Sequence, residues 1–379
     1  MTSDKSNLRT RVSETLCGSD TLLTACSLEF CPSKSNLLTC GLYQTDQLKD
    51  GTSKDGVDPQ TQRVGGCILY DLCIEGEMRD ANKIDSTYFD EIQRIKCPAV
   101  LDQKWTQGVD PVLITADSEG NLNSFYLKES DETYKSQLQV IEKFSCAPSD
   151  VLCLSLDISD KRDCNKDIKI VTSLSNGEVV LLRQIQSSRM LLEESRWNAH
   201  NFEPWTCGFD YWNLSTILTG GDDCKLKVWD SRDGLKNPVL VNKQFEGGVT
   251  AIRSHHLREH TFAVGSYDEV LRIFDKRNFS KALWNHNCGG GIWRLKWHTD
   301  RSEKLLVAAM HDGFKILDID SAGLNTPPQI NTIYNGHSSL AYGADWGETV
   351  LMNGKSSTIV GSCSFYDRSI QAWGVDLND

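Results

Sequence analysis

Apolar and polar residues alternate in the second half of the chain in a pattern that occurs four times. Each copy has a β-branched or apolar run, a turn of small residues that ends in Asp, and a second alternating segment. Such alternation predicts β-strands joined by tight turns. The copies are Leu218–Asp233, Phe262–Asn278, Leu306–Asp320 and Ile359–Trp373. Their turn aspartates are spaced 45, 44 and 55 residues apart and are Asp223, Asp268, Asp312 and Asp367.

Weaker copies of the same pattern precede these four. They are Lys169–Leu182, with Asn176 at the turn position, Pro111–Leu127, and a first copy that runs from Thr24 to Leu72. A period near 40–45 residues is typical of the WD repeat, in which four-stranded blades surround a central channel. We therefore predict an all-β fold, a seven-bladed WD-repeat β-propeller that forms one domain over residues 1–379. Polar residues 45–64 are expected to form a loop insertion in the first blade.

The closure of the ring can also be predicted. The last copy ends after its third strand, so its outer strand must come from elsewhere in the chain. Residues Thr10–Leu16 alternate and lie just before the first inner strand. We expect this N-terminal strand to complete the last blade and to cover its edge.

Net charge and cysteine content limit the ligands and the cell compartment that we expect for this chain. A net charge of −12 argues against nucleic-acid binding and against binding to an anionic membrane surface. The N-terminus is polar, and no apolar run is long enough to be inserted in a membrane. The fourteen cysteines contain no C-x-x-C pair, and several lie in strand-like runs. We predict free thiols in a reducing compartment, with the protein in the cytoplasm as a monomer.

Part of the polar pattern is expected to stabilise the blades. In a WD blade, a His before the inner strand, a Thr in the second strand, the turn Asp and a Trp in the third strand form one hydrogen-bonded chain. His200, Thr219, Asp223 and Trp229 occupy these positions in the strongest copy. We assign the same structural role to the turn residues Asp268, Asp312 and Asp367, and to His337.

The residue before each turn Asp lies on one face, near the channel mouth, and the fold does not dictate its identity. It is Asp222, Tyr267, His311 and Tyr366 in successive copies. The entries to the inner strands reach the same face and supply Glu203, Trp205, Trp293, Arg294, Ser339 and Tyr342. Polar, titratable and aromatic groups that converge on one face favour a binding pocket. The alternative is that this face simply docks other proteins.

No motif assigns a chemistry by itself. The chain has no G-x-S-x-G, H-E-x-x-H or P-loop sequence. The glycines 289–291 could offer N–H groups to an oxyanion, although three glycines more often form a tight loop. The histidines of the loop His255–His260 lack flanking ligands at a recognisable spacing, so we expect no metal site.

Several segments together resemble one family, the WD-repeat diphthine methyl ester hydrolases of diphthamide synthesis. The resemblance covers residues 196–373 and is carried by AHNFEPWTCGFDYWN, LTGGDDCKLKVWDSR, VGSYDEVLRIFDKRN, GGGIWRLKWH, AAMHDGFKIL, SLAYGADW and SCSFYDRSIQAW. It implies a carboxyl methylesterase that removes the methyl ester from over-methylated diphthine on translation elongation factor 2, without a cofactor. The products would be diphthine and methanol.

The substrate that the resemblance implies suggests roles for the residues of the predicted pocket. Diphthine carries a trimethylammonium group, which binds to aromatic faces beside a carboxylate. Trp205, Tyr267, Trp293, Tyr342 and Tyr366 are the candidate faces, Glu203 or Asp222 the carboxylate, and Arg294 a further substrate-binding residue. We expect Ser339 as the nucleophile, His311 as the base, and Asp222 as an orienting or cation-binding acid. His337 is the competing base.

A second class of function stays open at this point. The chain could be a non-catalytic scaffold that brings an enzyme to elongation factor 2 or to trafficking proteins. A scaffold has no need for the series of residues that precede the turn aspartates.

Overall fold

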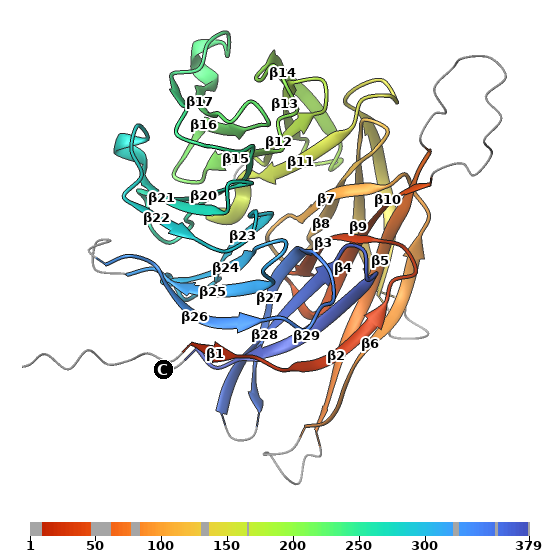
Figure 1. Cartoon of the computed structure of the whole chain (residues 1–379). Helices are drawn as coiled ribbons and strands as arrows, with labels where there is room; N and C mark the ends of the chain where they lie inside the picture. Colours follow the sequence, from red (N-terminus) through yellow and green to blue (C-terminus); the bar gives the residue numbers. More distant parts are fainter. Residues whose placement is uncertain are drawn as a thin grey trace, which may run out of the picture.

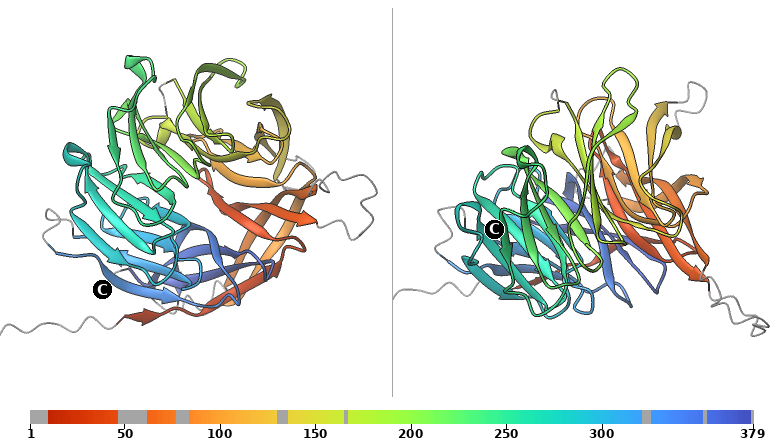
Figure 2. Two further views of the ribbon diagram at one scale, coloured as in Figure 1. Left: turned by 45° about the horizontal axis from the view of Figure 1, so that its top comes forward. Right: turned by 90° about the horizontal axis from the view of Figure 1, so that it is seen from above.

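The computed structural model describes residues 10–46, 62–76, 84–129, 136–164, 167–320, 326–352 and 355–377. Within these residues the chain forms seven sheets and three 3-10 helices of three residues each. The predicted all-β, seven-bladed propeller is confirmed. Figure 1 shows the sheets arranged in a ring, and the turned views in Figure 2 follow them from orange through green to blue.

The first three blades each take four consecutive strands. Blade one contains β3–β6, which are Ala25–Cys31, Lys34–Asp46, Gln62–Gly76 and Ile84–Ile95. Blade two contains β7–β10, which are Val100–Trp105, Val112–Asp117, Asn121–Glu129 and Ser136–Ser145. Blade three contains β11–β14, which are Cys153–Ile158, Lys169–Leu174, Glu178–Gln184 and Leu191–Asn198, with the 3-10 helix η1 (Ser159–Lys161) after β11.

Blades four to six follow the same order. Blade four contains β15–β18, which are Thr206–Asp210, Asn213–Gly220, Leu226–Asp230 and Leu240–Asn242, with η2 (Ser231–Asp233) after β17. Blade five contains β19–β22, which are Val249–Ser254, Thr261–Ser266, Val270–Asp275 and Trp284–Asn287, with η3 (Lys276–Asn278) after β21. Blade six contains β23–β26, which are Arg294–Trp297, Lys304–Ala308, Phe314–Asp318 and Gln329–Tyr334.

Blade seven is closed by the N-terminus, as predicted, but by a strand that begins five residues later and shares only Thr15 and Leu16 with the predicted range. Its strands β27 (Ala341–Met352), β28 (Lys355–Ser364) and β29 (Ser369–Val375) are completed by β2 (Thr15–Asp20), antiparallel to β29. Red β2 and blue β29 lie side by side in Figure 1. The range Thr10–Leu16 was wrong because β1 (Arg11–Val12) pairs in parallel with β26 of blade six. The N-terminus therefore joins two blades.

The predicted insertion in blade one is shorter than residues 45–64. Strand β4 extends to Asp46 and β5 begins at Gln62, and the two strands pair over that length. Residues 47–61, which make up most of the predicted loop, lie outside the described residues.

The first strand of each blade lies at the channel. These inner strands contact each other in a closed ring, in the order β3, β7, β11, β15, β19, β23, β27 and back to β3. Carboxylates join neighbouring inner strands: Asp102 accepts from the Leu156 N–H at 3.0 Å and Asp157 from the Phe209 N–H at 2.9 Å. We call the face with the turns between second and third strands the upper face, and the opposite one the lower face.

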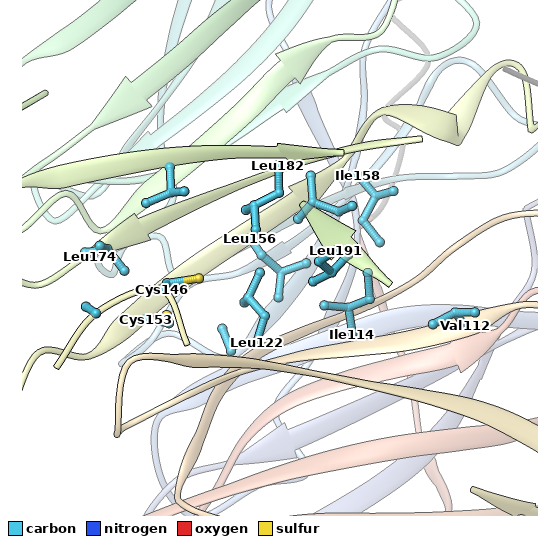
Figure 3. Packing of buried hydrophobic residues seen from close by; sticks show 14 residues of the cluster. Val112, Ile114, Leu122, Cys146, Cys153, Leu156, Ile158, Leu174, Leu182 and Leu191 are labelled. Atoms are coloured by element: carbon cyan, nitrogen blue, oxygen red, sulfur yellow. The ribbon is translucent and has the colours of Figure 1, made fainter. Parts of the chain in front are cut away.

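Apolar side chains between neighbouring sheets form the core. Figure 3 shows one such cluster, in which Ile114 and Leu122 of blade two meet Leu156 and Leu182 of blade three. These side chains are fully buried because each sheet is covered on both faces by its neighbours. All fourteen cysteines are free thiols, and nine of them are buried. No helix of the described segments is long and apolar enough to cross a membrane.

Candidate active site on the upper face

Two predicted catalytic residues border one cavity on the upper face. The cavity has a volume of about 610 Å³ and lies between blades six and seven. His311 lies in the turn that joins β24 to β25, and Ser339 precedes β27; both line this cavity, together with Tyr366 and His337. The His311 side chain is exposed and Ser339 is half-buried. Among the described residues, no hydrogen bond joins the two side chains.

A backbone contact between the blades accounts for this proximity. The Ala341 N–H donates to the Met310 carbonyl at 2.8 Å, and these residues form an isolated antiparallel bridge. Met310 directly precedes His311, and Ala341 follows Ser339 by two residues. Met310 has a φ of 23°, a conformation that side-chain-bearing residues rarely adopt. Backbone strain of this kind tends to occur at functional sites, where the surrounding structure enforces it.

An aromatic cluster covers the upper channel mouth beside the cavity. The Trp293 ring lies 6.1 Å from Trp205, 6.1 Å from Tyr267 and 4.8 Å from Tyr342, measured between ring centroids. These residues come from blades four to seven, so the fold alone brings them together. Every pair is tilted, as aromatic pairs prefer. The structure thus gathers four of the five predicted aromatic residues in one place.

The cluster continues to the cavity through residues that the sequence did not single out. Phe365 lies 4.8 Å from Tyr342 and 5.0 Å from Tyr366, and Tyr43 of blade one lies 6.1 Å from Phe365. Tyr366 is the fifth predicted aromatic residue and is 67% exposed. Phe365 directly precedes Tyr366, so extending the comparison by one position would have found it.

Asp222 is the carboxylate of the aromatic cluster. Its Oδ1 accepts a hydrogen bond from the Trp205 indole at 3.2 Å, and the side chain is exposed. Burial and, to a smaller extent, the negative charge of Asp222 together raise the pKa of Tyr267 to about 12. A Cβ at Gly248 would lie 2.8 Å from Asp222 Oδ1 and 3.2 Å from the Tyr267 ring, so this position needs a glycine to let them approach. We call Trp205, Tyr267, Trp293 and Asp222 the aromatic–carboxylate cage.

The structure does not bring Asp222 to the predicted catalytic pair. Asp222 lies in blade four, two blades from His311, and does not border the cavity. Glu203 lies beside it, since the Asp222 N–H donates to the Glu203 carbonyl at 2.9 Å. Arg294 lies deeper in the channel, where it donates to the Leu101 carbonyl at 3.3 Å and pairs with Asp102 at 3.1 Å.

The predicted structural residues of blade four form one chain. His200 Nδ1 bonds to Asp223 Oδ1 at 2.8 Å, His200 Nε2 to Thr219 Oγ1 at 2.8 Å, and the Trp229 indole donates to Thr219 Oγ1 at 2.9 Å. Burial lowers the pKa of His200, while Asp223 opposes that shift. His200 is therefore neutral, and its hydrogen bonds to Asp223 and Thr219 hold its side chain within blade four.

His337 is engaged in the same way in blade seven. Its Nδ1 bonds to Ser369 Oγ and its Nε2 to Ser362 Oγ, both at 2.9 Å. Asp367 accepts from the Ser369 hydroxyl at 3.0 Å and lies 3.6 Å from His337 Nδ1. Since both ring nitrogens are used within the blade, His337 is a poor competitor for the role of catalytic base.

Blades five and six hold their turn aspartates with cations instead of a histidine. Asp268 receives two bonds from the Arg272 guanidinium, at 2.9 and 2.7 Å. Asp312 binds the ammonium of Lys315, which also donates to the Cys288 carbonyl at 2.7 Å. The described residues contain no group of three or more His, Cys, Asp or Glu side chains that could hold a metal ion.

Comparisons with known proteins show the family to which this chain belongs. No protein-family model matches the chain. The diphthine methyltransferase homolog of Dictyostelium discoideum is 34% identical over 369 residues, which cover 92% of this chain and 96% of that protein. The diphthine methyltransferases of mouse and human are 36% and 35% identical; each alignment covers 86% of this chain, and 68% and 73% of the relative.

Among solved structures, a chain of the crystal structure of a mitotic checkpoint complex matches with a TM-score of 0.64. It is 11% identical and the match covers 99% of this chain and 98% of that chain, so it shows the fold alone. The relatives from Dictyostelium, mouse and human match at more than 30% identity over most of the chain. The chain therefore belongs to the family of the diphthine methyltransferases.

Proposed function

We propose that this protein is a carboxyl methylesterase that hydrolyses the methyl ester of methylated diphthine on translation elongation factor 2. Diphthine and methanol would be the products, in the cytoplasm, and the protein would act as a monomer without a cofactor. The observation that carries the proposal is the aromatic–carboxylate cage beside a cavity that holds a serine and a histidine.

The cage suits the cationic part of this substrate. A trimethylammonium group has no N–H to donate, so it gains most from the negative faces of aromatic rings and from a nearby carboxylate. Trp205, Tyr267 and Trp293 supply three such faces, and Asp222 supplies the charge. In this proposal Asp222 binds the cation, because its place in blade four keeps it from orienting His311.

The cavity would hold the ester. Ser339 Oγ attacks the ester carbonyl while His311 accepts its proton, and the bond from carbonyl carbon to methoxy oxygen then breaks. His311 returns the proton to methoxide, which leaves as methanol. Water attacks the acyl-serine with His311 as base, and the carboxylate is released. His311 is exposed and bound to no other described side chain, so it is free to take this role.

The test is hydrolysis by the purified protein alone in water enriched with ¹⁸O, with elongation factor 2 carrying methylated diphthine. We expect methanol release and one ¹⁸O atom in the diphthine carboxylate, measured by mass spectrometry. The relatives are named as methyltransferases, which favours methyl transfer as a second candidate. Methyl transfer would leave the carboxylate unlabelled, and no reaction without a second protein would favour the scaffold.

Ser339→Ala and His311→Ala test the residue roles. Each is expected to lower turnover about 100-fold or more, because loss of a nucleophile or general base removes transition-state stabilisation. Ser280→Ala is the matched control: Ser280 is exposed on the loop between β21 and β22, away from the cavity. Turnover near that of the wild type in both site variants would contradict the assignment.

A further inference from the structure

A buried ammonium group ties blade six to blade five beside His311. Lys315, the second residue of β25, is 3% exposed. It donates to the Cys288 carbonyl at 2.7 Å, to the Asp312 carbonyl at 2.8 Å, and to the Asp312 carboxylate. An ammonium group has three N–H donors, so all of them are used. Two of the three bonds hold Asp312, the residue that directly follows His311.

The residue before His311 is held from the opposite side. The Met310 carbonyl accepts from the Ala341 N–H of blade seven at 2.8 Å, and Met310 has the unusual φ of 23°. His311 therefore lies between a residue that is bonded to blade seven and a residue that Lys315 ties to blade five. The His311 side chain itself is exposed and bound to no other described side chain. Its position thus depends on the backbone of the turn.

Two glycines of the loop before β23 pack against the same turn. A Cβ at Gly289 would overlap the Asp312 carboxylate. A Cβ at Gly290 would overlap the Ala309 carbonyl oxygen and would lie 3.1 Å from the His311 backbone nitrogen. Both positions need glycine, because a side chain there would push the turn away. The loop therefore supports the turn of His311 at close range.

Blade five has the same arrangement around Tyr267. Arg272 is 7% exposed and donates to both carboxylate oxygens of Asp268, the residue after Tyr267, at 2.9 and 2.7 Å. A Cβ at Gly247 would lie 2.8 Å from the Asp268 nitrogen and 3.1 Å from the Tyr267 Cβ. Two successive blades thus combine a buried cation with a closely packed glycine loop. Each combination holds one residue of the proposed site.

The fold does not require a cation at this place. In blade four the turn aspartate Asp223 is bonded to His200. In blade seven Asp367 lies 3.6 Å from His337. In both blades the second ring nitrogen of the histidine bonds to a hydroxyl of the same blade, whereas Lys315 reaches a carbonyl of the neighbouring blade. The link in blade six therefore fixes its turn relative to blade five as well.

We propose that Lys315 is a positioning residue for His311. Its bonds to Asp312 and to the Cys288 carbonyl hold the turn so that the exposed imidazole borders the cavity. This inference rests on the proposed function, in which His311 is the base. A base must lie within hydrogen-bond reach of the hydroxyl that it deprotonates, and a displacement of about 1 Å can lower turnover about 100-fold.

Lys315→Met tests this role, because methionine fills the space of the lysine stem without the ammonium. Asp312 is half exposed, so its carboxylate can be hydrated in the variant and the blade should still fold. We expect kcat for the methylated elongation factor to fall about 10- to 100-fold, with KM changed less than about twofold. The Asp312 amide hydrogen, bonded to the Ala309 carbonyl at 2.6 Å, should also exchange faster in NMR measurements.

Lys304→Met is the matched control. Lys304 is 4% exposed and loses an ion pair of the same kind, to Asp318 at 2.6 Å, but it lies at the lower end of blade six. Urea unfolding should show that the two variants lose similar amounts of stability. In Lys304→Met, however, kcat and the exchange of the Asp312 amide should match the wild type.

Arg272→Met distinguishes the two buried cations. It removes the corresponding link from the turn of Tyr267, which belongs to the aromatic–carboxylate cage. KM should therefore rise about fivefold through weaker binding of the cation, while kcat changes little. Lys315→Met should show the opposite division between kcat and KM.

Equal losses of kcat in Lys315→Met and Lys304→Met would overturn the inference, as would an unchanged kcat in Lys315→Met. Absence of methanol release by the wild type would contradict the proposed function instead. In that case the exchange of the Asp312 amide decides: faster exchange in Lys315→Met alone supports the inference that Lys315 holds the turn, and equal exchange in both lysine variants overturns it.

Discussion

The Thr219 hydroxyl connects a chain of hydrogen bonds in blade four. The Trp229 indole donates to Thr219, and His200 Nδ1–H donates to Asp223, so the Thr219 hydroxyl must donate to His200 Nε2. Each member of this chain donates to the next in one direction. The chain is buried, and removing one member leaves its neighbours unpaired.

Thr219→Val tests this arrangement, since valine has the same shape without the hydroxyl. Two buried groups, the Trp229 N–H and His200 Nε2, would lose their partner, and we expect a loss of about 3 kcal/mol in the free energy of unfolding. Urea unfolding measures it. Thr216→Val in the same strand is the control, because Thr216 is partly exposed and its hydroxyl accepts a hydrogen bond from the Asn213 side chain at 3.0 Å. Equal losses in both variants would show that these hydrogen bonds contribute little to the free energy of unfolding.

At the residue scale, comparison of the repeated copies shows which positions reach the upper face. It does not show to which side of a strand a given side chain points. Tyr267 and His311 precede their turn aspartates, and both reach the upper face. Arg294 is predicted to line the same pocket because it lies at the entry to an inner strand. Side chains of a strand alternate, however, and Arg294 and Lys296 both face the channel, where they meet Asp102 and Glu29. Alternation along β23 would have shown this in advance.

Among the elements, β2 is the one that joins the N-terminus to the last blade. It covers the edge of β29, and Leu16 and Cys17 pack against the core between blades one and seven. Deletion of residues 1–20 removes this strand and exposes the edge. We expect the midpoint of thermal unfolding to fall by about 5 °C or more, with aggregation through β29.

Deletion of residues 1–9 is the control for this truncation, because it leaves β1 and β2 intact. It should unfold as the full chain does. Calorimetry of the three proteins makes the comparison, and an unchanged midpoint after removal of residues 1–20 would show that the ring closes without β2.

The position of β2 could not be read from local sequence. Residues 10–16 alternate well, whereas Thr15–Asp20 include a glycine and an aspartate and look like a turn. Their partner, β29, lies about 350 residues away, and pairing over that distance leaves no local signal. The same holds for the bridge from Met310 to Ala341, which brings His311 to Ser339. Repeats predicted the blades, while contacts between blades were found only in the structure.

At the scale of the whole molecule, the closed ring buries titratable groups that would otherwise be solvated. His255 is fully buried, stacks on Trp297 and bonds to the Ser302 carbonyl at 2.8 Å, and burial lowers its pKa to about 3. His298 is buried in the neighbouring blade, with a pKa lowered to about 4. Glu29 differs: its lysine partners outweigh its burial and lower its pKa to about 2.

These shifts predict acid sensitivity in two stages. An unfolded histidine takes up a proton below about pH 6.5, whereas buried His255 and His298 do not, so stability falls as the pH drops below 6.5. Each contributes up to about 1.4 kcal/mol per pH unit, and together about 5 kcal/mol is lost between pH 6.5 and 4.5. Glu29 is ionised in both states over that range, and its contribution is lost only from about pH 4.5 down towards pH 2.

Urea unfolding at pH 7.0, 5.5 and 4.5 measures the first stage. Ser280→Ala should show the same slope as the wild type, because Ser280 is exposed and has no group that titrates in this range. A free energy of unfolding that stays constant from pH 7.0 to 4.5 would mean that His255 and His298 accept protons in the folded ring. Loss of stability only below pH 4.5 would assign acid unfolding to the channel carboxylates alone.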